Sequence, residues 1–438
     1  MSDKLSRRRF LQAGGLVAAA SALRAGTRES HGAPDPESGE NSAAAPSLPA
    51  AGLNLKGLFL HAWDLRDDGV DTVMGWMRDS GLNTMQLAGT YHSGWFLHPQ
   101  NSRHRAFMTE GSRCYFHPHE EFYKGTSLKP LPSAVSKETD WFAEAGRRLD
   151  SHGLRLVSWT VGTHNTHLGL AHPEHAQRNV YGDSLPHALC PADDDVREYL
   201  KALCRDLAAS YPMWGILAES FGWSGQAHGH HHERDLVGLT PLERQLAALC
   251  FCPSCRRKAA GAGVDMEETR RTVKATLDAA FRDAPDRPAG HPRTMADLEE
   301  KSRELGRFND WRRLTAEALI MDIRRESLKN TDCRLIMLGG YQAGLAAAAD
   351  GFSCMAYGKS AAETMGICAE FRGQVPSSWK GALTCHIRLG MGRPKDAAEL
   401  RAIVQAVRQS GCNGIGFYSR SESPPRMLSW IKSSLREL

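Results

Sequence analysis

Eight short apolar segments alternate with helical segments from residue 55 to the end of the chain, and this alternation limits the fold more than any other feature. Each segment has strand length, and most are followed by residues with apolar side chains at helical spacing. The strands are expected at 55–63, 83–88, 155–161, 214–218, 333–338, 352–357, 382–387 and 414–418. The helices are expected at 67–81, 137–152, 193–210, 360–372, 395–410 and 425–437. This order predicts an α/β chain folded as a parallel (β/α)8 barrel, that is, a TIM barrel.

Glycines at helix ends support the assignment. Gly81, Gly153 and Gly411 each stand at the C-terminal end of a predicted helix and just before a predicted strand, where a left-handed residue commonly ends a helix. The structural alternative is an open, doubly wound sheet. No Gly-x-Gly-x-x-Gly turn follows the first strand, which argues against a dinucleotide-binding version of that sheet. Only residues 343–350 separate the fifth and sixth strands, so we expect that barrel unit to be degenerate.

Two long segments interrupt the repeat. The loop at 92–134 after the second strand is rich in aromatic residues and histidines, as binding loops often are. A helical insertion at 225–330 follows the fourth strand, and its charges at helical spacing indicate solvated helices. Both belong to a barrel domain that we place at 53–438.

The first fifty residues are different in kind. Ser6-Arg7-Arg8-Arg9-Phe10-Leu11 and the weakly apolar run 13–22 resemble a twin-arginine export signal, with Gln12 where the usual pattern has Lys. We assign 1–26 to this signal and 27–52, rich in Ala, Ser, Pro and Gly, to a flexible linker. The resemblance implies a translocase partner during export and a periplasmic or extracellular location. The apolar run at 13–22 is too short to be a stable membrane span. We therefore expect no stable membrane span in the mature form.

In a (β/α)8 barrel the chemistry stands at the carboxyl ends of the strands. The side chains expected there are aromatic and hydrogen-bonding, with few acids, which suits a sugar: flat rings pack on its C–H faces while polar groups bind its hydroxyls. The predicted substrate-binding residues are His61, Trp63, Tyr91, His92, Trp159, His164, Trp223, Tyr357, His386, Arg388 and Tyr418.

Glu219 is the most suggestive single residue. It directly follows the apolar strand 214–218, at the point where a barrel strand enters the mouth. Burial among aromatic residues would raise the pKa of its carboxyl, as a general acid for glycosidic oxygen requires. The alternative is a structural carboxylate paired with an arginine such as Arg388. A glycosidase also needs a second carboxylate, and the seventh strand carries no acid that could supply it. The candidates elsewhere are Asp64, Glu233 and Glu422, of which we favour Asp64 and Glu422.

Eleven scattered cysteines do not form the dense framework of a small secreted domain. Cys252-x-x-Cys255, with Cys250 beside it, has the spacing of zinc ligands, and a structural zinc or a disulfide would both fit. A fourth ligand would have to come from His228–His232 or from a remote cysteine. The histidines of that loop could also bind a catalytic metal at the mouth, although no cofactor is required by the main hypothesis.

Several stretches together resemble exported bacterial barrel proteins of the glycoside-hydrolase-like superfamily, over roughly residues 55–435. They are 91–95, 115–118, 189–191, 215–221, 228–230 and 249–252. The resemblance implies that Glu219 occupies the strand-four acid position. It also implies a nucleophile on strand seven, for which this sequence has no acid.

Three functions follow as hypotheses. The first is an exported enzyme that hydrolyses a glycosidic bond of a carbohydrate substrate. The second is a non-catalytic carbohydrate-binding barrel, which would explain the missing acid. The third is a metal-dependent lyase or isomerase that uses the histidines. Nucleic acid is excluded as a partner, because 54 basic residues against 50 acidic ones leave a net charge of only +4, most of it at the N-terminus.

Overall fold

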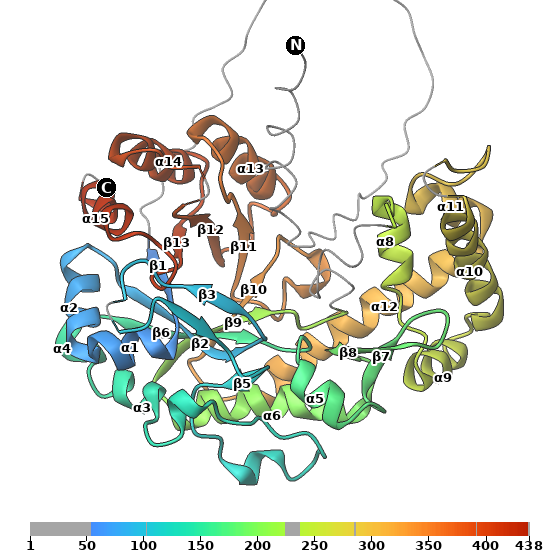
Figure 1. The fold of residues 1–438 in the computed structure, drawn as a ribbon, viewed down its shortest axis with the longest axis horizontal. Coiled ribbons are helices and arrows are strands. Elements are labelled where there is room, and N and C mark those ends of the chain that lie inside the picture. Colours follow the sequence, from blue (N-terminus) through green and yellow to red (C-terminus); the bar gives the residue numbers. More distant parts are fainter. Residues whose placement is uncertain (1–53, 102, 224–236, 284–285, 391, 437–438) are drawn as a thin grey trace, which may run out of the picture.

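Eight parallel strands close into a barrel in a computed structural model, which describes residues 54–101, 103–223, 237–283, 286–390 and 392–436 (Figure 1). β1 pairs with both β2 and β13, which closes the sheet. The strands are β1 (Leu55–Leu60), β2 (Thr84–Tyr91), β6 (Arg155–Val161), β9 (Met213–Glu219), β10 (Arg334–Leu338), β11 (Gly351–Met355), β12 (Ala382–Arg388) and β13 (Gly414–Tyr418). The (β/α)8 prediction is therefore confirmed.

Helices lie outside the strands, as the alternation predicts. They are α1 (Ala62–Asp68), α2 (Val70–Asp79), α3 (Trp141–Gly146), α4 (Leu149–His152), α6 (Asp194–Ser210), α13 (Ala361–Gly373), α14 (Ala397–Gln409) and α15 (Pro425–Leu435). Asp193 begins α6 by accepting backbone N–H bonds from Asp195 and Val196, and apolar side chains on one face of the helix are buried. Between β10 and β11 there is only a short 3-10 turn, η4 (Ala343–Leu345), so this unit is degenerate as predicted.

The first strand is shorter than predicted. It ends at Leu60, and the chain turns at once into α1, where the Asp64 side chain accepts a hydrogen bond from the His61 N–H at 2.9 Å. This capping bond ends the strand three residues before Trp63. The change matters because residues 61–64 were expected on the strand and at its exit, and instead they form the first turn of a helix.

The loop after β2 folds over the barrel mouth. It contains the hairpin of β3 (Trp95–Leu97) and β4 (Ala106–Met108), the short strand β5 (Arg113–Cys114), and the 3-10 turns η1 (Glu120–Tyr123) and η2 (Ala134–Ser136). β5 pairs antiparallel with β2. The loop after β6 carries α5 (Thr166–Ala171) and a second hairpin, β7 (Ala176–Arg178) with β8 (Ser184–Leu189).

The insertion after β9 is a helical unit beside the barrel, at the right of Figure 1. It consists of α8 (Pro241–Ala247), α9 (Pro253–Gly261), α10 (Met266–Arg282), α11 (Met295–Lys301) and α12 (Arg303–Asp322), which returns through the turn η3 (Ile323–Ser327) to β10. A separate hydrophobic core includes Leu246, Val273, Leu277, Leu305 and Phe308. The insertion therefore has apolar contacts of its own.

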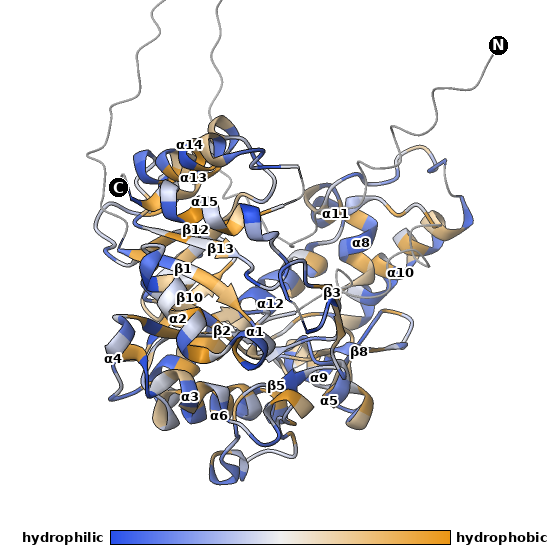
Figure 2. Ribbon diagram, turned by 60° about the vertical axis from the view of Figure 1, so that its left-hand side comes forward, coloured by the Kyte–Doolittle hydropathy of each residue, from blue (hydrophilic) through white to orange (hydrophobic). Residues whose placement is uncertain are grey.

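The barrel core lies between the strands and the surrounding helices, where Figure 2 shows hydrophobic strands inside a polar outer layer. One glycine inside the barrel is required by a close approach: a Cβ at Gly416 would lie 2.2 Å from Nδ1 of His386. The His386 ring thus occupies the space that a side chain at position 416 would need. No helix in the described part of the chain is long and apolar enough to cross a membrane.

Candidate active site

Glu219 stands at the carboxyl end of β9, where the sequence placed it. Its side chain is half-buried, and its Oε2 accepts a hydrogen bond from Nε1 of Trp159 on β6 at 2.5 Å. Burial raises the pKa of Glu219, and the indole N–H opposes this rise because it stabilises the carboxylate. A carboxyl in this position can hold a proton to higher pH than an exposed glutamate and still reach a ligand.

Three tyrosines gather beside this carboxyl. The Tyr91 ring packs edge-on against Trp159, with centroids 4.6 Å apart, and its hydroxyl lies 3.2 Å from the hydroxyl of Tyr418. The Tyr357 and Tyr418 rings are 5.8 Å apart. Burial raises the pKa of Tyr91 well above its usual value, and the charge of Glu219 adds to this rise. The three phenols therefore stay protonated and can donate hydrogen bonds.

Glu422 belongs to the same group of side chains. Arg388, at the end of β12, lies 3.5 Å from Glu422 and 5.5 Å from the centre of the Tyr418 ring, and the Ser419 hydroxyl donates to Glu422 at 3.1 Å. The negative charges of Glu219 and Glu422 both raise the pKa of Tyr91 and of Tyr357. Two carboxylates thus flank one set of tyrosines, and both are partly accessible.

Asp64 is held differently. Its carboxylate is 3% exposed, and it accepts hydrogen bonds from the Ser421 hydroxyl at 2.6 Å and from Arg420 at 3.2 Å. Burial raises the pKa of Asp64, and the Arg420 guanidinium opposes that rise. The capping bond to His61 and this ion pair use the acceptor capacity of both oxygens, so Asp64 ties α1 to the segment after β13.

We predict that Asp64→Asn destabilises the fold without removing the chemistry of the site. The substitution replaces a buried carboxylate that Arg420 and Ser421 contact by a neutral amide, while Arg420 keeps Asp68. Losing hydrogen bonds to a buried charged group costs about 2 kcal/mol. Urea unfolding should show this loss. The matched variant Asp68→Asn changes the more exposed carboxylate that also pairs with Arg420, at 2.7 Å, and should cost less than about 1 kcal/mol. Equal stabilities of the two variants would contradict the structural role.

Several predicted ligand-binding residues lie in the interior of the protein. His61 and Trp63 have no exposed surface, and their rings stack at 4.3 Å. His386 is also fully buried, and burial lowers its pKa to about 3. These side chains support the rim from beneath, and in this structure they have no surface for a sugar to contact.

The remaining predicted residues lie around the rim. His92 stacks on Tyr91 at 4.3 Å and on His164 at 4.5 Å, which brings both histidines next to the tyrosines. Trp223 is half-buried and packs toward the insertion, with its ring 6.0 Å from that of Trp311. The loop with His228, His230, His231, His232 and Glu233 lies outside the described residues.

The cysteine cluster gains a fourth member that spacing alone did not identify. Cys190, just after β8, has its Sγ 3.3 Å from that of Cys255, 3.5 Å from that of Cys252 and 4.0 Å from that of Cys250. All four are buried. A tetrahedral zinc with Zn–S bonds of 2.3 Å has sulfur atoms about 3.8 Å apart, so the four thiols fit this ion.

A half-buried arginine lies close to these thiols. The Arg312 guanidinium on α12 lies 4.9 Å from the centre of the Trp223 ring, and burial lowers its pKa while Cys255, Cys250 and Cys190 oppose that change. A zinc with four thiolates carries a charge of −2, which a nearby guanidinium would partly balance. The cluster joins the barrel loop that ends at β8 to the start of α9 in the insertion.

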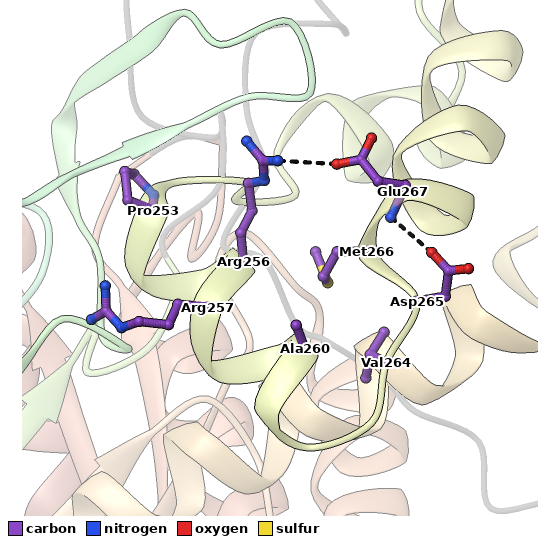
Figure 3. Close-up of a pocket in the computed structure, with 8 residues that line it drawn as sticks. All are labelled: Pro253, Arg256, Arg257, Ala260, Val264, Asp265, Met266 and Glu267. Carbon is purple, nitrogen blue, oxygen red and sulfur yellow. Dashed lines mark hydrogen bonds and ion pairs between the residues drawn. The ribbon is translucent and has the colours of Figure 1, made fainter.

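A surface hollow of about 580 Å³ lies in the insertion between α9 and α10 (Figure 3). Arg256 and Glu267 pair across it at 3.0 Å, and Arg257, Val264 and Met266 also line it. None of its lining residues belongs to the predicted sugar site. The group around Glu219 is therefore the better candidate, because it stands at the strand ends, where barrel enzymes hold their reactive groups.

Comparisons with known proteins agree with the fold. An α-L-fucosidase isoenzyme from Paenibacillus thiaminolyticus superposes with a TM-score of 0.50 at 10% identity, over 88% of this chain and 49% of the fucosidase. The β-amylase catalytic domain of Paenibacillus polymyxa has a TM-score of 0.49 at 10% identity, over 89% of this chain and 99% of that domain. A β-galactosidase from the psychrophilic Marinomonas ef1 has a TM-score of 0.49 at 12% identity, over 87% of this chain and 59% of the galactosidase. These structural neighbours are glycoside hydrolases with TIM-barrel folds.

No protein-family model matches the sequence, and no curated protein matches it. At such low identity the structural likeness establishes the fold alone. The case for an activity must therefore come from the side chains at the mouth.

We predict that Trp159→Phe raises the pKa of Glu219. The indole N–H stabilises the carboxylate, so its removal favours the protonated acid, while a phenyl ring keeps the packing. The midpoint of the carboxyl titration, followed by the infrared band of the carboxylate in a difference spectrum against Glu219→Gln, should move to higher pH. A midpoint that moves to lower pH, or stays in place, would show that this hydrogen bond does not act on Glu219.

Proposed function

We propose that this chain is a glycosidase that hydrolyses a glycosidic bond of an extracytoplasmic glycan, with Glu219 as its general acid. The observation that carries the proposal is a half-buried carboxyl at the end of β9, with a pKa raised by burial and a direct hydrogen bond from Trp159. Such a carboxyl can donate a proton to the leaving oxygen near neutral pH. The glycoside-hydrolase fold of the structural neighbours supports this assignment.

We assign the second carboxylate to Glu422. Asp64 is buried and paired with Arg420. Glu422, in contrast, is partly accessible, and its charge acts on the same two tyrosines, Tyr91 and Tyr357, as the charge of Glu219. Glu422 would activate water or stabilise the positive charge that develops on the sugar ring. Glu422 lies 3.5 Å from Arg388, whereas Glu219 has the indole of Trp159 beside it and a pKa raised by burial. Two carboxyls in such different environments can divide the two roles.

The rim supplies the sugar-binding contacts. Tyr418, Tyr357 and Arg388 are partly exposed and offer hydroxyl and guanidinium donors to sugar oxygens, and the aromatic faces suit the C–H faces of the ring. His92 and His164 extend the same rim from the loops after β2 and β6. Trp159 and Tyr91 lie behind them and position Glu219 and Tyr418.

One observation favours a non-catalytic carbohydrate-binding barrel as the second candidate. β12, the seventh barrel strand, ends in Arg388 where many barrel glycosidases have an acid, and Arg388 pairs with Glu422. A screen of nitrophenyl glycosides and of oligosaccharides, read by release of chromophore and by calorimetric binding, separates the two candidates. Turnover of any glycoside supports the glycosidase. If sugars bind but none of them is hydrolysed, the non-catalytic carbohydrate-binding barrel is supported.

We also propose a structural zinc on Cys190, Cys250, Cys252 and Cys255, and export through the twin-arginine pathway. Four buried thiols with Sγ atoms all within 4.8 Å of one another support the zinc. The nearby Arg312 guanidinium and an N–H bond from Cys255 to the Cys252 sulfur at 3.5 Å suit a thiolate set. Export rests on the Arg7-Arg8 motif, which lies outside the described residues. Folding before export would let the chain load zinc while its thiols are reduced.

A further inference from the structure

A second group of cysteines lies at β11, β12 and α13, separate from the cysteine cluster that joins the insertion to the barrel. Cys354 on β11 and Cys385 on β12 are neighbours in the sheet register, and Cys368 comes from α13, which packs over these strands. The three Sγ atoms lie within 4.8 Å of one another, with Cys354 and Cys368 4.0 Å apart. Cys412, just before β13, is near enough for Cys354 and Cys368 to influence the pKa of its thiol, although it lies outside the set of three sulfurs within 4.8 Å of one another. All four side chains are buried.

We infer that Cys354, Cys368, Cys385 and Cys412 form a second thiolate site for a single divalent metal ion of the zinc class. Sulfur is a ligand that selects Zn²⁺ over Mg²⁺ or Ca²⁺, and four sulfurs favour tetrahedral geometry. The sulfurs of Cys354, Cys368 and Cys385 need to approach one another by at most about 1 Å to reach the separation of about 3.8 Å in a zinc tetrathiolate, and Cys412 would move toward them as the fourth ligand. This site lies apart from Glu219 and does not depend on the proposed activity.

The position of these thiols shows that they face away from the substrate. On β12 the side chains alternate, and His386 points into the barrel, so its neighbour Cys385 points outward toward the helices. Ser353 on β11 points inward and donates its hydroxyl to the Met337 carbonyl, so Cys354 also faces outward. The group therefore sits between the sheet and α13, where a metal would have a structural role.

The fold gives a reason for a cross-link at this place. The connection between β10 and β11 has only the 3-10 turn η4, so this part of the wall lacks a full covering helix of its own. A metal held by β11, β12, α13 and the segment before β13 would join four parts of this side of the barrel. Arg388 and Tyr418 stand at the far ends of β12 and β13, so the metal would hold the strands that carry them.

Three other cysteines provide matched controls. Cys114, Cys204 and Cys333 are buried as well. In the described residues, they belong neither to the cysteine group around Cys252 nor to the one around Cys354. Because a Cys→Ala change at Cys204 removes the same atoms from an equally buried position, it measures the packing cost alone.

The test is zinc stoichiometry of the full chain, purified without a histidine tag and measured by elemental mass spectrometry. We expect two zinc ions per chain in the native protein and in Cys204→Ala, and one in Cys385→Ala and in Cys252→Ala. Replacing zinc by Co²⁺ should give sulfur-to-cobalt charge-transfer absorption that halves in each of the two single-site variants.

A variant that fails to fold does not decide the question, so the native protein provides the second measurement. Denaturation in the presence of an alkylating reagent, followed by peptide mass spectrometry, should find all four cysteines as free thiols. One zinc per native chain, all of it lost in Cys252→Ala, would overturn the inference. A disulfide between Cys354 and Cys368 would overturn it as well. Because Glu219 contributes no ligand, two zinc ions in Glu219→Gln would separate this inference from the proposed activity.

Discussion

Replacement of Glu219 by Gln should lower kcat by about 10³-fold on any glycoside whose leaving group needs a proton. The amide keeps the shape of the side chain but cannot donate a proton to the leaving oxygen. It can still accept the hydrogen bond of Trp159 through its carbonyl oxygen. The folded structure should therefore persist, and the loss should appear in turnover rather than in the binding of the sugar.

The leaving group provides an internal control for this result. An activated dinitrophenyl leaving group departs without protonation, so Glu219→Gln should retain much more activity on that substrate than on an unactivated disaccharide. Glu422→Gln should instead reduce the rate for both. If Glu219→Gln binds and turns over both substrates as the native protein does, Glu219 is not the acid.

Replacement of Cys252 by Ala should remove one zinc ion and lower the melting temperature by at least about 5 °C more than the matched variant Cys204→Ala. Cys252 is one of the four proposed ligands, and it also begins α9 through the N–H bond from Cys255. Loss of the proposed ion would leave three thiols buried beside Arg312, and a structural zinc site contributes folding free energy directly. Calorimetry of the full chain, with zinc analysis of the same samples, measures both effects.

The part of the chain that Cys252→Ala destabilises distinguishes the loss of a zinc cross-link from a general loss of packing. The cluster joins the segment after β8 to α9, so the insertion should lose protection from amide hydrogen exchange before the barrel strands do. Uniform loss of protection, or an unchanged zinc content, would contradict the proposed zinc cross-link. The native chain treated with a chelator should show the same pattern without any substitution.

The alternation of apolar strands and amphipathic helices was enough to predict the barrel, because both periods are local properties of the sequence. β6 and β13 lie at the predicted residues 155–161 and 414–418, and the turn between β10 and β11 is short as expected. Glu219 was found by the same reasoning, since the end of a parallel strand is also the entrance of the site.

Residues 61–64 show where local reasoning failed. The apolar run continues through Trp63, so the pattern could not reveal that Asp64 would cap a helix and pair with Arg420, which lies 356 residues away in the chain. Similarly, His386 looked like a ligand-binding residue. Its place beside Gly416 inside the barrel follows from the register of two strands, which no single segment contains.

The sequence by itself determined the barrel, its insertion and the acid at the end of the fourth barrel strand, because strand ends and helix faces are encoded in local patterns. Only the tertiary structure decided that Asp64 is buried against Arg420 while Glu422 stays partly accessible, and which cysteines meet. Cys190 joins Cys252 across 62 positions, and Cys354 joins Cys368 only because α13 packs against β11. Such contacts depend on how distant segments close the barrel, and the free energy of that closure comes from the whole core rather than from any one motif.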